Sequence, residues 1–326
     1  MIAPRTMPVP RISDAPRQPA PPARRRSLRG LGTAVLAVAV AAGIGFSGAI
    51  PSVNGIGTAW TSFLPWTAVL IVLLGAVAVL RRAWWGLSAV LIAAMVWSGV
   101  FVPQLIPAAA ASGAPELTVA TQNIGAANAD QAAATQALAA TGAGIVAVQE
   151  IVGAGDATAV LDAGYGYHAR VSTVGLWAQW PMGDPEPLTL GLAWARAFRV
   201  VVHHPAGDIA VYAVHLPSVR PGDTAARDAA VDQLSALVAA DPAGRVLVLG
   251  DLNTAGTDPA LQALTGQLAD SRQTVRGGFG FTWPAGFPAT RPDHVLGRGV
   301  TMLSDQVLAA QGSDHRAVLV GLNLPG

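Results

Sequence analysis

The sequence predicts an α/β domain of about 210 residues that follows three transmembrane helices. Two observations predict this arrangement. In the second part of the chain, apolar runs of strand length alternate with helical segments, and most of these runs end abruptly in a polar residue. In the first third, long stretches carry no charged residue at all. The chain therefore combines a membrane-type segment with a domain that has its own buried core.

The predicted anchor covers residues 31–107. No charged residue occurs between Gly30 and Leu80, or between Ala83 and Pro115. Three segments within these stretches have a length that crosses a bilayer: Leu31–Ile50, Leu64–Leu80 and Trp84–Ile106. The middle segment is the shortest of the three and would cross with little tilt.

The arginines orient this anchor. Seven precede the first segment, and Arg81 and Arg82 separate the second from the third. The positive-inside rule places the amino terminus and the Arg81–Arg82 turn in the cytoplasm, so three crossings leave everything after Pro107 outside it. This predicts a multi-pass plasma-membrane protein with an extracytoplasmic domain. Alternatively, Leu31–Ile50 is a cleaved signal, and the later orientation is unchanged.

Composition separates the remaining regions. Residues 1–30 are rich in Arg and Pro and predict a disordered cytoplasmic tail, whose arginines suit anionic lipid better than nucleic acid. Residues 108–115 form an Ala/Pro/Gly linker, and residues 116–326 form the domain. The domain has no cysteine to form disulfides. From Ser112 onward, eleven arginines face eighteen acidic residues, a formal net charge of −7 that disfavours non-specific binding of a polyanion.

Within the domain, strands and helices follow from apolar periodicity. The strand-like segments are Leu117–Thr121, Gly144–Val148, Leu188–Trp194, Val200–His203, Ile209–Val214, Arg245–Leu249, Arg291–Leu296 and Ala317–Leu322. The helical segments are Ala127–Ala140, Thr224–Ala240 and Asp258–Leu268. The fourth and fifth strands are separated by Pro-Ala-Gly-Asp, which predicts a hairpin.

Polar residues of one chemical kind follow these strands. The clearest case is Gly-Asp-Leu-Asn, where Asp251 and Asn253 are two residues apart and point the same way on an extended backbone. A carboxylate beside a neutral amide suits a site where a phosphate and a hard cation meet. A strand that ends in a polar turn produces such a pair by chance, and an isolated Asn123 or His215 is more often structural. The repetition at five or six strand ends favours a functional site.

The motifs, taken in order, are Gln-Asn, Gln-Glu, His-Leu, Gly-Asp-Leu-Asn, Arg-x-Asp-His and Ser-Asp-His. This order resembles the endonuclease/exonuclease/phosphatase superfamily, the group of deoxyribonuclease I, over residues 115–324. The layout of three spans before this domain also resembles actinomycete membrane proteins associated with teicoplanin resistance. The resemblance implies a four-layer α/β sandwich, in which two packed mixed β-sheets are flanked by helices and the site lies at one rim.

The resemblance also implies a metal site. Glu150 would be the principal Mg²⁺ ligand, with help from Asn123 and Asp314, and Mn²⁺ is the natural substitute. All three side chains offer oxygen donors, which a hard cation requires.

The remaining roles concern the phosphate and the attacking water. By resemblance, His315 is oriented by Asp293 and acts on the scissile phosphate as a general base or as a phosphate ligand. Asp251 would orient the water, and Asn253 with His215 would hold the phosphoryl oxygens as charge develops. These five residues and the three metal ligands make up the predicted site.

Other residues are candidates for substrate contacts. One of four arginines, Arg196, Arg199, Arg220 and Arg291, is expected to clamp a phosphate. The aromatic residues Phe279, Phe281 and Trp283 either stack on a substrate, contact lipid or pack beneath their own loop. The family usually has Ser-Arg where this chain has Ala178-Gln179, which puts the substrate contacts in doubt and leaves the metal ligands intact.

These observations predict a membrane-anchored, Mg²⁺-dependent phosphoesterase that hydrolyses a lipid-linked or small phosphate ester or pyrophosphate outside the cytoplasm. Its partners would be the bilayer and that phosphorylated substrate. The alternatives are a tethered nuclease, which the superfamily permits and the acidic domain disfavours, and a degenerate envelope-binding module without activity. The sequence leaves open the natural substrate, a link to glycopeptide resistance and the oligomeric state.

Overall fold

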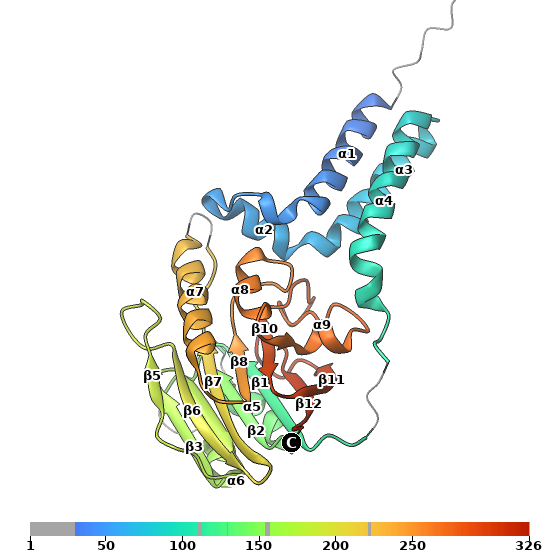
Figure 1. Ribbon diagram of the computed structural model, residues 1–326. Helices are drawn as coiled ribbons and strands as arrows, with labels where there is room; N and C mark the ends of the chain where they lie inside the picture. Colours follow the sequence, from blue (N-terminus) through green and yellow to red (C-terminus); the bar gives the residue numbers. More distant parts are fainter. Residues whose placement is uncertain (1–29, 110–112, 129, 154–156, 221–222, 326) are drawn as a thin grey trace, which may run out of the picture.

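The computed structural model describes residues 30–109, 113–128, 130–153, 157–220 and 223–325. The predicted tail at residues 1–29 and part of the predicted linker lie outside these ranges. The described chain has two parts (Figure 1): a group of helices formed by its first residues, and an α/β domain from which these helices project.

Two six-stranded mixed sheets form the α/β domain. The first sheet has the order β11 (Thr301–Val307), β12 (Val318–Asn323), β1 (Leu117–Asn123), β2 (Ile145–Gln149), β4 (Val174–Ala178), β3 (Tyr167–Val171). The second has the order β5 (Glu186–Leu188), β6 (Ala197–His204), β7 (Gly207–His215), β8 (Val246–Asp251), β10 (Asp293–Arg298), β9 (Ala269–Asp270). Only the pairs β1–β2 and β7–β8 are parallel.

The layers follow from what packs on each face of the sheets. Between the sheets lies a core of buried aliphatic and aromatic residues, among them Leu176, Phe198 and Leu249. On the outer face of the first sheet, α5 (Gln131–Ala140) and α6 (Ala159–Gly164) contribute Leu138 and Leu161 to a second core. On the outer face of the second sheet lie α7 (Ala225–Ala240), η4 (Pro259–Leu261) and α8 (Gln262–Thr265). The expected four-layer sandwich is confirmed.

Most of the strand and helix predictions correspond to observed elements, with one error and several omissions. The predicted strand Leu188–Trp194 is wrong: β5 ends at Leu188, and the chain then turns through Leu190 and Gly191, both at positive φ. The sequence did not reveal the strands β3, β9 and β11, nor α6 and α9 (Ser271–Val275). The resemblance to the family placed a strand at residues 175–181, where β4 lies. β3 and β11 are edge strands with many polar residues, so their sequences lack the apolar runs by which the other strands were found.

The helices of the predicted anchor do not form the three separate transmembrane spans that the sequence predicts. The predicted anchor contains α1 (Leu31–Gly45), η1 (Ser47–Ala49), η2 (Val53–Gly55), α2 (Ile56–Ser62), η3 (Leu64–Trp66), α3 (Thr67–Leu80) and α4 (Trp84–Leu105). In the described chain, one helix, α4, is long and apolar enough to cross a membrane, and a second span exists only if 53–62 and 64–80, which meet at a 65° bend, count together. With 15 and 14 residues, α1 and α3 fall below the roughly 20 that a crossing needs.

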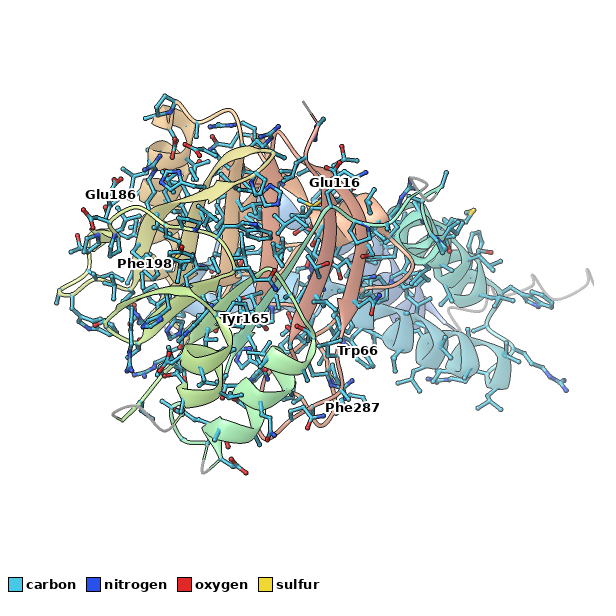
Figure 2. The ribbon with its side chains drawn as sticks, turned by 90° about the horizontal axis from the view of Figure 1, so that it is seen from below. Trp66, Glu116, Tyr165, Glu186, Phe198 and Phe287 are labelled. Atoms are coloured by element: carbon cyan, nitrogen blue, oxygen red, sulfur yellow. The ribbon has the colours of Figure 1, made fainter. Side chains whose placement is uncertain are left out.

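The helices of the predicted anchor are docked on the α/β domain. The helix α2 lies across one end of the domain, and α1, α3 and α4 extend away from it (Figure 1). The indole N–H of Trp66 donates to the carbonyl of Ala289 at 2.9 Å, and its ring packs on Phe281 and Phe287 (Figure 2). Phe279 packs against Phe101 of α4. The two aromatic residues 279 and 281 therefore pack against the anchor, whereas Trp283 faces the cavity described below.

Candidate active site

The strand topology brings the predicted site residues to one rim. In the two parallel pairs, Asn123 lies beside Gln149, which precedes Glu150, and His215 lies beside Asp251. β10 runs antiparallel to β8, so its first residue, Asp293, pairs with the last residue of β8. The segment before β12 approaches the same rim because Ser313 donates a hydrogen bond to the Asn123 carbonyl at 2.6 Å. This places Asp314 and His315 beside the other residues.

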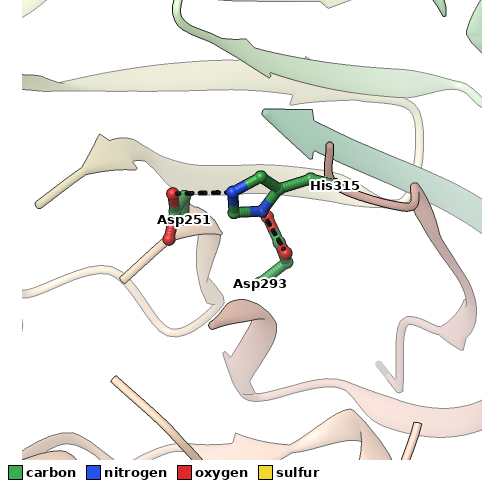
Figure 3. A group of neighbouring side chains, drawn as sticks. All are labelled: Asp251, Asp293 and His315. Atoms are coloured by element: carbon green, nitrogen blue, oxygen red, sulfur yellow. Dashed lines mark hydrogen bonds and ion pairs between the residues drawn. The ribbon is translucent and has the colours of Figure 1, made fainter. Parts of the chain in front are cut away.

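A buried histidine–aspartate pair lies at the centre (Figure 3). His315 Nδ1 is 2.9 Å from Asp293 Oδ2, and the Thr282 hydroxyl donates to the same oxygen at 2.5 Å. Burial lowers the pKa of His315, but the charge and hydrogen bond of Asp293 outweigh it and raise that pKa to about 10. The same partners hold the pKa of Asp293 below its usual value despite burial. At neutral pH this pair is an imidazolium and a carboxylate.

Asp251 faces the other side of the imidazole. Its Oδ2 lies 3.9 Å from His315 Nε2, and its Oδ1 accepts the Asn253 backbone N–H at 2.8 Å. Burial raises the pKa of Asp251 to about 6, with a contribution from the charge of Asp293 and opposition from that of His315. The strand residue before it must be glycine: Gly250 of β8 has φ 147°, and a Cβ there would lie 1.9 Å from the Val214 carbonyl oxygen.

Glu150 is a half-buried carboxylate that hydrogen bonds hold in place. The Ala126 N–H donates to Oε2 at 2.6 Å, and the Asn123 amide donates to Oε1 at 3.1 Å and to Asp251 at 3.0 Å. Burial would raise the pKa of Glu150, but these two hydrogen bonds and the nearby histidines hold it below its usual value. Its backbone has φ 60°, so this carboxylate is held at a strained turn.

His215 is neutral at physiological pH, in contrast to His315. Its Nε2 lies 3.4 Å from Glu150 Oε1, and an Arg196 nitrogen lies 3.2 Å from both ring nitrogens. Burial, and then the charge of Arg196, lower the pKa of His215 to about 4. The contact between His215 and Glu150 is therefore a polar contact between a neutral ring and a carboxylate.

The donor set fits a hard divalent cation. Glu150, Asp251 and Asp314 line one cavity, and the exposed Asp314 accepts a hydrogen bond from the Trp283 indole at 3.2 Å. These are oxygen donors that carry negative charge, as Mg²⁺ prefers. Donor atoms of Asp251, Asp293 and His315 also lie within 4.8 Å of one another. The assignment of Glu150 and Asp314 as metal ligands remains a prediction.

Asn123 takes a different orientation from that of a metal ligand. Its amide nitrogen faces Glu150 and Asp251, and its oxygen accepts the Gly125 N–H at 2.9 Å. To offer its oxygen to a cation beside Glu150, the amide would rotate by about half a turn and lose those donor bonds. In this arrangement Asn123 holds the two carboxylates. Its role as a ligand remains a prediction.

The arginines divide into bound and available groups. Arg199 is paired with Asp241 and Glu186, and Arg291 is paired with Asp305. Arg196 and Arg220 instead line a hollow of about 390 Å³ that adjoins Glu150 and His215. Trp194 packs against the Arg196 guanidinium, whose carbon lies 5.0 Å from the ring centre. Two of the four candidate arginines are therefore in a position to meet a phosphate.

The main cavity has a volume of about 700 Å³ and two unlike walls. One wall carries the polar residues described above. The other comes from the anchor and includes Asn54, Ile56, Thr58, Ala59 and Phe63. The sequence did not reveal this wall, because residues 54–63 were interpreted as part of a membrane anchor and a loop. Thr282 was not found either, because no pattern surrounds this single threonine.

A family model now connects this geometry with known proteins. The model described as the endonuclease/exonuclease/phosphatase family matches residues 120–315, more than half of the chain. The chain belongs to this family. The matched range begins in β1 and ends at His315, so it contains seven of the predicted site residues directly and His315 as its last residue. A comparison of the sequence with curated proteins gave no significant match.

Solved structures of the family have the same fold. Humanized TDP2 from D. rerio has 16% identity and a TM-score of 0.55, with 64% of this chain and 98% of that chain covered. An endonuclease/exonuclease/phosphatase from Bacteroides vulgatus has 17% identity and a TM-score of 0.54, with coverage of 64% and 99%. D. rerio TDP2 complexed with a single-strand DNA product has 16% identity and a TM-score of 0.53, with coverage of 64% and 98%. At this identity the likeness establishes the fold.

Proposed function

We propose that the protein is a divalent-cation-dependent phosphoesterase that acts on a lipid-linked or small phosphate ester or pyrophosphate at a membrane surface. One observation carries the proposal: carboxylates and His315 line a cavity that is also lined by residues of the predicted anchor, among them the apolar side chains of Ile56, Ala59 and Phe63. Family membership supports hydrolysis of a phosphate ester, and the apolar wall supports a substrate with an apolar part.

The residues divide the chemistry among them. The His315 imidazolium, which Asp293 keeps protonated, would hold a phosphoryl oxygen and offset the negative charge that develops there. Asp251, with a raised pKa, would orient the attacking water and accept its proton. Neutral His215 and the Asn253 amide would hold further phosphoryl oxygens. Mg²⁺ or Mn²⁺ held by Glu150 and Asp314 would neutralise phosphate charge as a Lewis acid.

The orientation in the membrane is part of the proposal. Gly30 lies against Ala83, so the start of α1 and the Arg81–Arg82 turn meet at one end of the helix group. The other end, at Thr58 and Trp66, contacts the α/β domain. The arginines and the α/β domain therefore lie at opposite ends of the helix group. This arrangement supports an anchor in the plasma membrane whose arginine end is cytoplasmic and whose catalytic domain is extracytoplasmic. The link to teicoplanin resistance rests only on the similar order of anchor and domain.

A substrate panel tests the function. Full-length protein in detergent is assayed with Mg²⁺ on a prenyl pyrophosphate, sphingomyelin, an inositol phosphate and DNA. We expect hydrolysis of a lipid phosphate, loss of turnover in EDTA and recovery with Mg²⁺ or Mn²⁺. His315→Gln should abolish turnover, while the matched variant His203→Gln, at an exposed histidine, should not. Turnover that survives both EDTA and His315→Gln would refute the proposal.

The second candidate is a nuclease, favoured by the hollow around Trp194, Arg196 and Arg220. An aromatic ring beside arginines suits a nucleotide, because the base stacks and the phosphate pairs with a guanidinium. In the same panel, DNA or RNA hydrolysis that exceeds lipid hydrolysis and falls steeply with salt would establish this alternative. A protein that binds no divalent cation by calorimetry would instead be a non-enzymatic module.

A further inference from the structure

We infer that α2 and the turns around it form the part of the substrate site that binds the hydrocarbon chain of a lipid phosphate. The anchor is then a substrate-selecting element in addition to a tether. The inference rests on the proposed function, because it assumes that the phosphate of the substrate lies against the polar wall. It goes further by assigning the opposite wall to a particular part of the substrate.

Two adjoining hollows share the same three side chains. Ile56, Ala59 and Phe63 line the catalytic cavity, and they also line a second hollow of about 460 Å³. That second hollow continues along Trp66 and Leu70, together with Trp60 and Thr67. An apolar surface therefore leads from the phosphate end of the cavity, around α2, to the apolar helix α3.

The two faces of α2 are reversed relative to a helix on a soluble domain. Gly57, Thr58 and Thr61 are buried against the rest of the protein. Ile56 and Phe63 are exposed, at 66% and 43%. A surface helix normally buries its apolar stripe and exposes its polar one. An exposed apolar face beside a catalytic cavity needs an apolar occupant to keep it from water.

Polar contacts hold α2 against the loop that follows β8, residues 252–258. Thr257 donates to the Thr61 carbonyl at 2.5 Å, and the buried Arg227 lies 3.3 Å from the Thr58 hydroxyl. Arg227 also donates to the Asn253 carbonyl at 2.9 Å and pairs with Asp258 at 3.0 Å. One guanidinium thus joins the anchor helix to a predicted phosphate-binding residue. The apolar wall is fixed in position relative to the polar one.

The chemistry of the two ends identifies the occupant. The polar end presents carboxylates and the imidazole of His315, which suit a phosphate with a bound cation. The other end reaches α3, and no charged residue occurs in the chain from residue 30 to residue 80. A molecule with a phosphate at one end and a hydrocarbon chain at the other matches both. A small water-soluble ester would leave the apolar half of the surface uncovered.

A chain-length comparison tests the inference. Long-chain and short-chain alkyl esters of 4-nitrophenyl phosphate share one leaving group and differ only in the alkyl chain. We expect Phe63→Ser and Ile56→Ser, in the full-length protein, each to lower the ratio of kcat/KM for the long over the short ester by about tenfold. The matched control Val72→Ser removes an exposed apolar residue of α3 that lines neither hollow, and should leave the ratio unchanged.

The outcomes separate the inference from the function. If the wild-type protein hydrolyses neither ester nor any lipid phosphate in the panel, the proposed function fails. If it hydrolyses both esters and the Phe63→Ser and Ile56→Ser ratios equal that of Val72→Ser, the inference is overturned and the function stands.

A binding measurement covers the case in which a variant does not fold. A non-hydrolysable long-chain phosphonate with a diazirine near the chain end is photolysed with the wild-type protein and Mg²⁺. We expect labelling within residues 56–70 that excess inorganic phosphate reduces. A probe with the same chain and no phosphonate should label this segment several-fold less. Equal labelling by the two probes would show that the face only contacts bilayer lipid, and would overturn the inference.

Discussion

The two walls of the catalytic cavity are built in opposite ways. The polar wall consists of strand ends and the residues beside them, and hydrogen bonds fix several of its functional side chains; Asp251, for example, accepts bonds from Asn123 and Asn253. The other wall comes from α2 and the turns that flank it, where the apolar side chains of Ile56 and Phe63 are exposed. One wall is organised for chemistry, and the other is organised for contact with something apolar.

In the proposed function, this difference gives a family fold a preference for a substrate with an apolar part. The sheets position the reacting groups, and they do so whatever segment lies opposite them. The opposing segment comes from outside the matched family range of residues 120–315. We propose that this added segment changes what the cavity accepts without altering the residues that would act on phosphate.

The largest effect should come from the polar wall. Glu150→Gln keeps the size of the side chain and removes its charge, so we expect a loss of about 10³-fold in kcat/KM with Mg²⁺. The measurement is steady-state hydrolysis by the full-length protein. Glu186→Gln, at an exposed carboxylate paired only with Arg199, is the control and should retain activity. Activity within tenfold of wild type would remove Glu150 from the site.

The second-largest effect should come from Arg227, the residue that joins the two walls. Arg227→Met removes a buried charge that pairs with Asp258 and contacts Thr58, so we expect a loss of about 3 kcal/mol in the free energy of unfolding. Thermal and denaturant unfolding in detergent measure this loss. Asp228→Asn changes only the half-exposed partner of Arg227 and should cost far less. Equal effects of the two variants would show that Arg227 is not a structural link between the walls.

The third-largest effect should come from Asp270, a buried residue that contacts His294. Burial raises the pKa of Asp270, but His294, which lies 2.8 Å away, and other partners lower it to about 2. A folded-state pKa below the unfolded value stabilises the protein above about pH 4, and this stabilisation is lost as the pH falls towards 2. Asp270→Asn should therefore lower stability by about 2 kcal/mol at neutral pH.

Unfolding measured from pH 7 to pH 3 checks this prediction. The stability difference between wild type and Asp270→Asn should shrink as the pH falls below about 4, because the wild-type carboxylate becomes protonated. A difference that stays constant over this range would mean that the ion pair with His294 contributes nothing.

The smallest effect should come from the contact between anchor and domain. Trp66→Phe keeps an aromatic ring against Phe287 and removes the N–H that donates to the Ala289 carbonyl, so we expect a loss of about 1 kcal/mol. Denaturant unfolding measures it. Trp85→Phe, at an exposed tryptophan of α4, provides the comparison. If neither variant changes stability, docking depends on the ring contacts alone.

Much of the polar wall could be predicted from the sequence because it is local. Each functional residue follows or precedes an apolar strand, and the strand pattern is visible over a few residues, as in the run that ends at Asp251. The order of the motifs supplied the family. The strand Leu188–Trp194 was wrong because apolar residues also occur in turns, and Leu190 adopts a left-handed conformation that no local pattern reveals.

The sequence by itself determined the fold class, the four-layer family and the identity of the acidic and histidine residues at the rim. Only the tertiary structure decided that α2 faces those residues, that Arg227 connects the two, and that the first two of the three predicted spans are short or bent. The physical reason is distance along the chain: Thr58 and Arg227 are 169 residues apart. Periodicity reports which side of a helix is apolar, but only packing decides what that side meets.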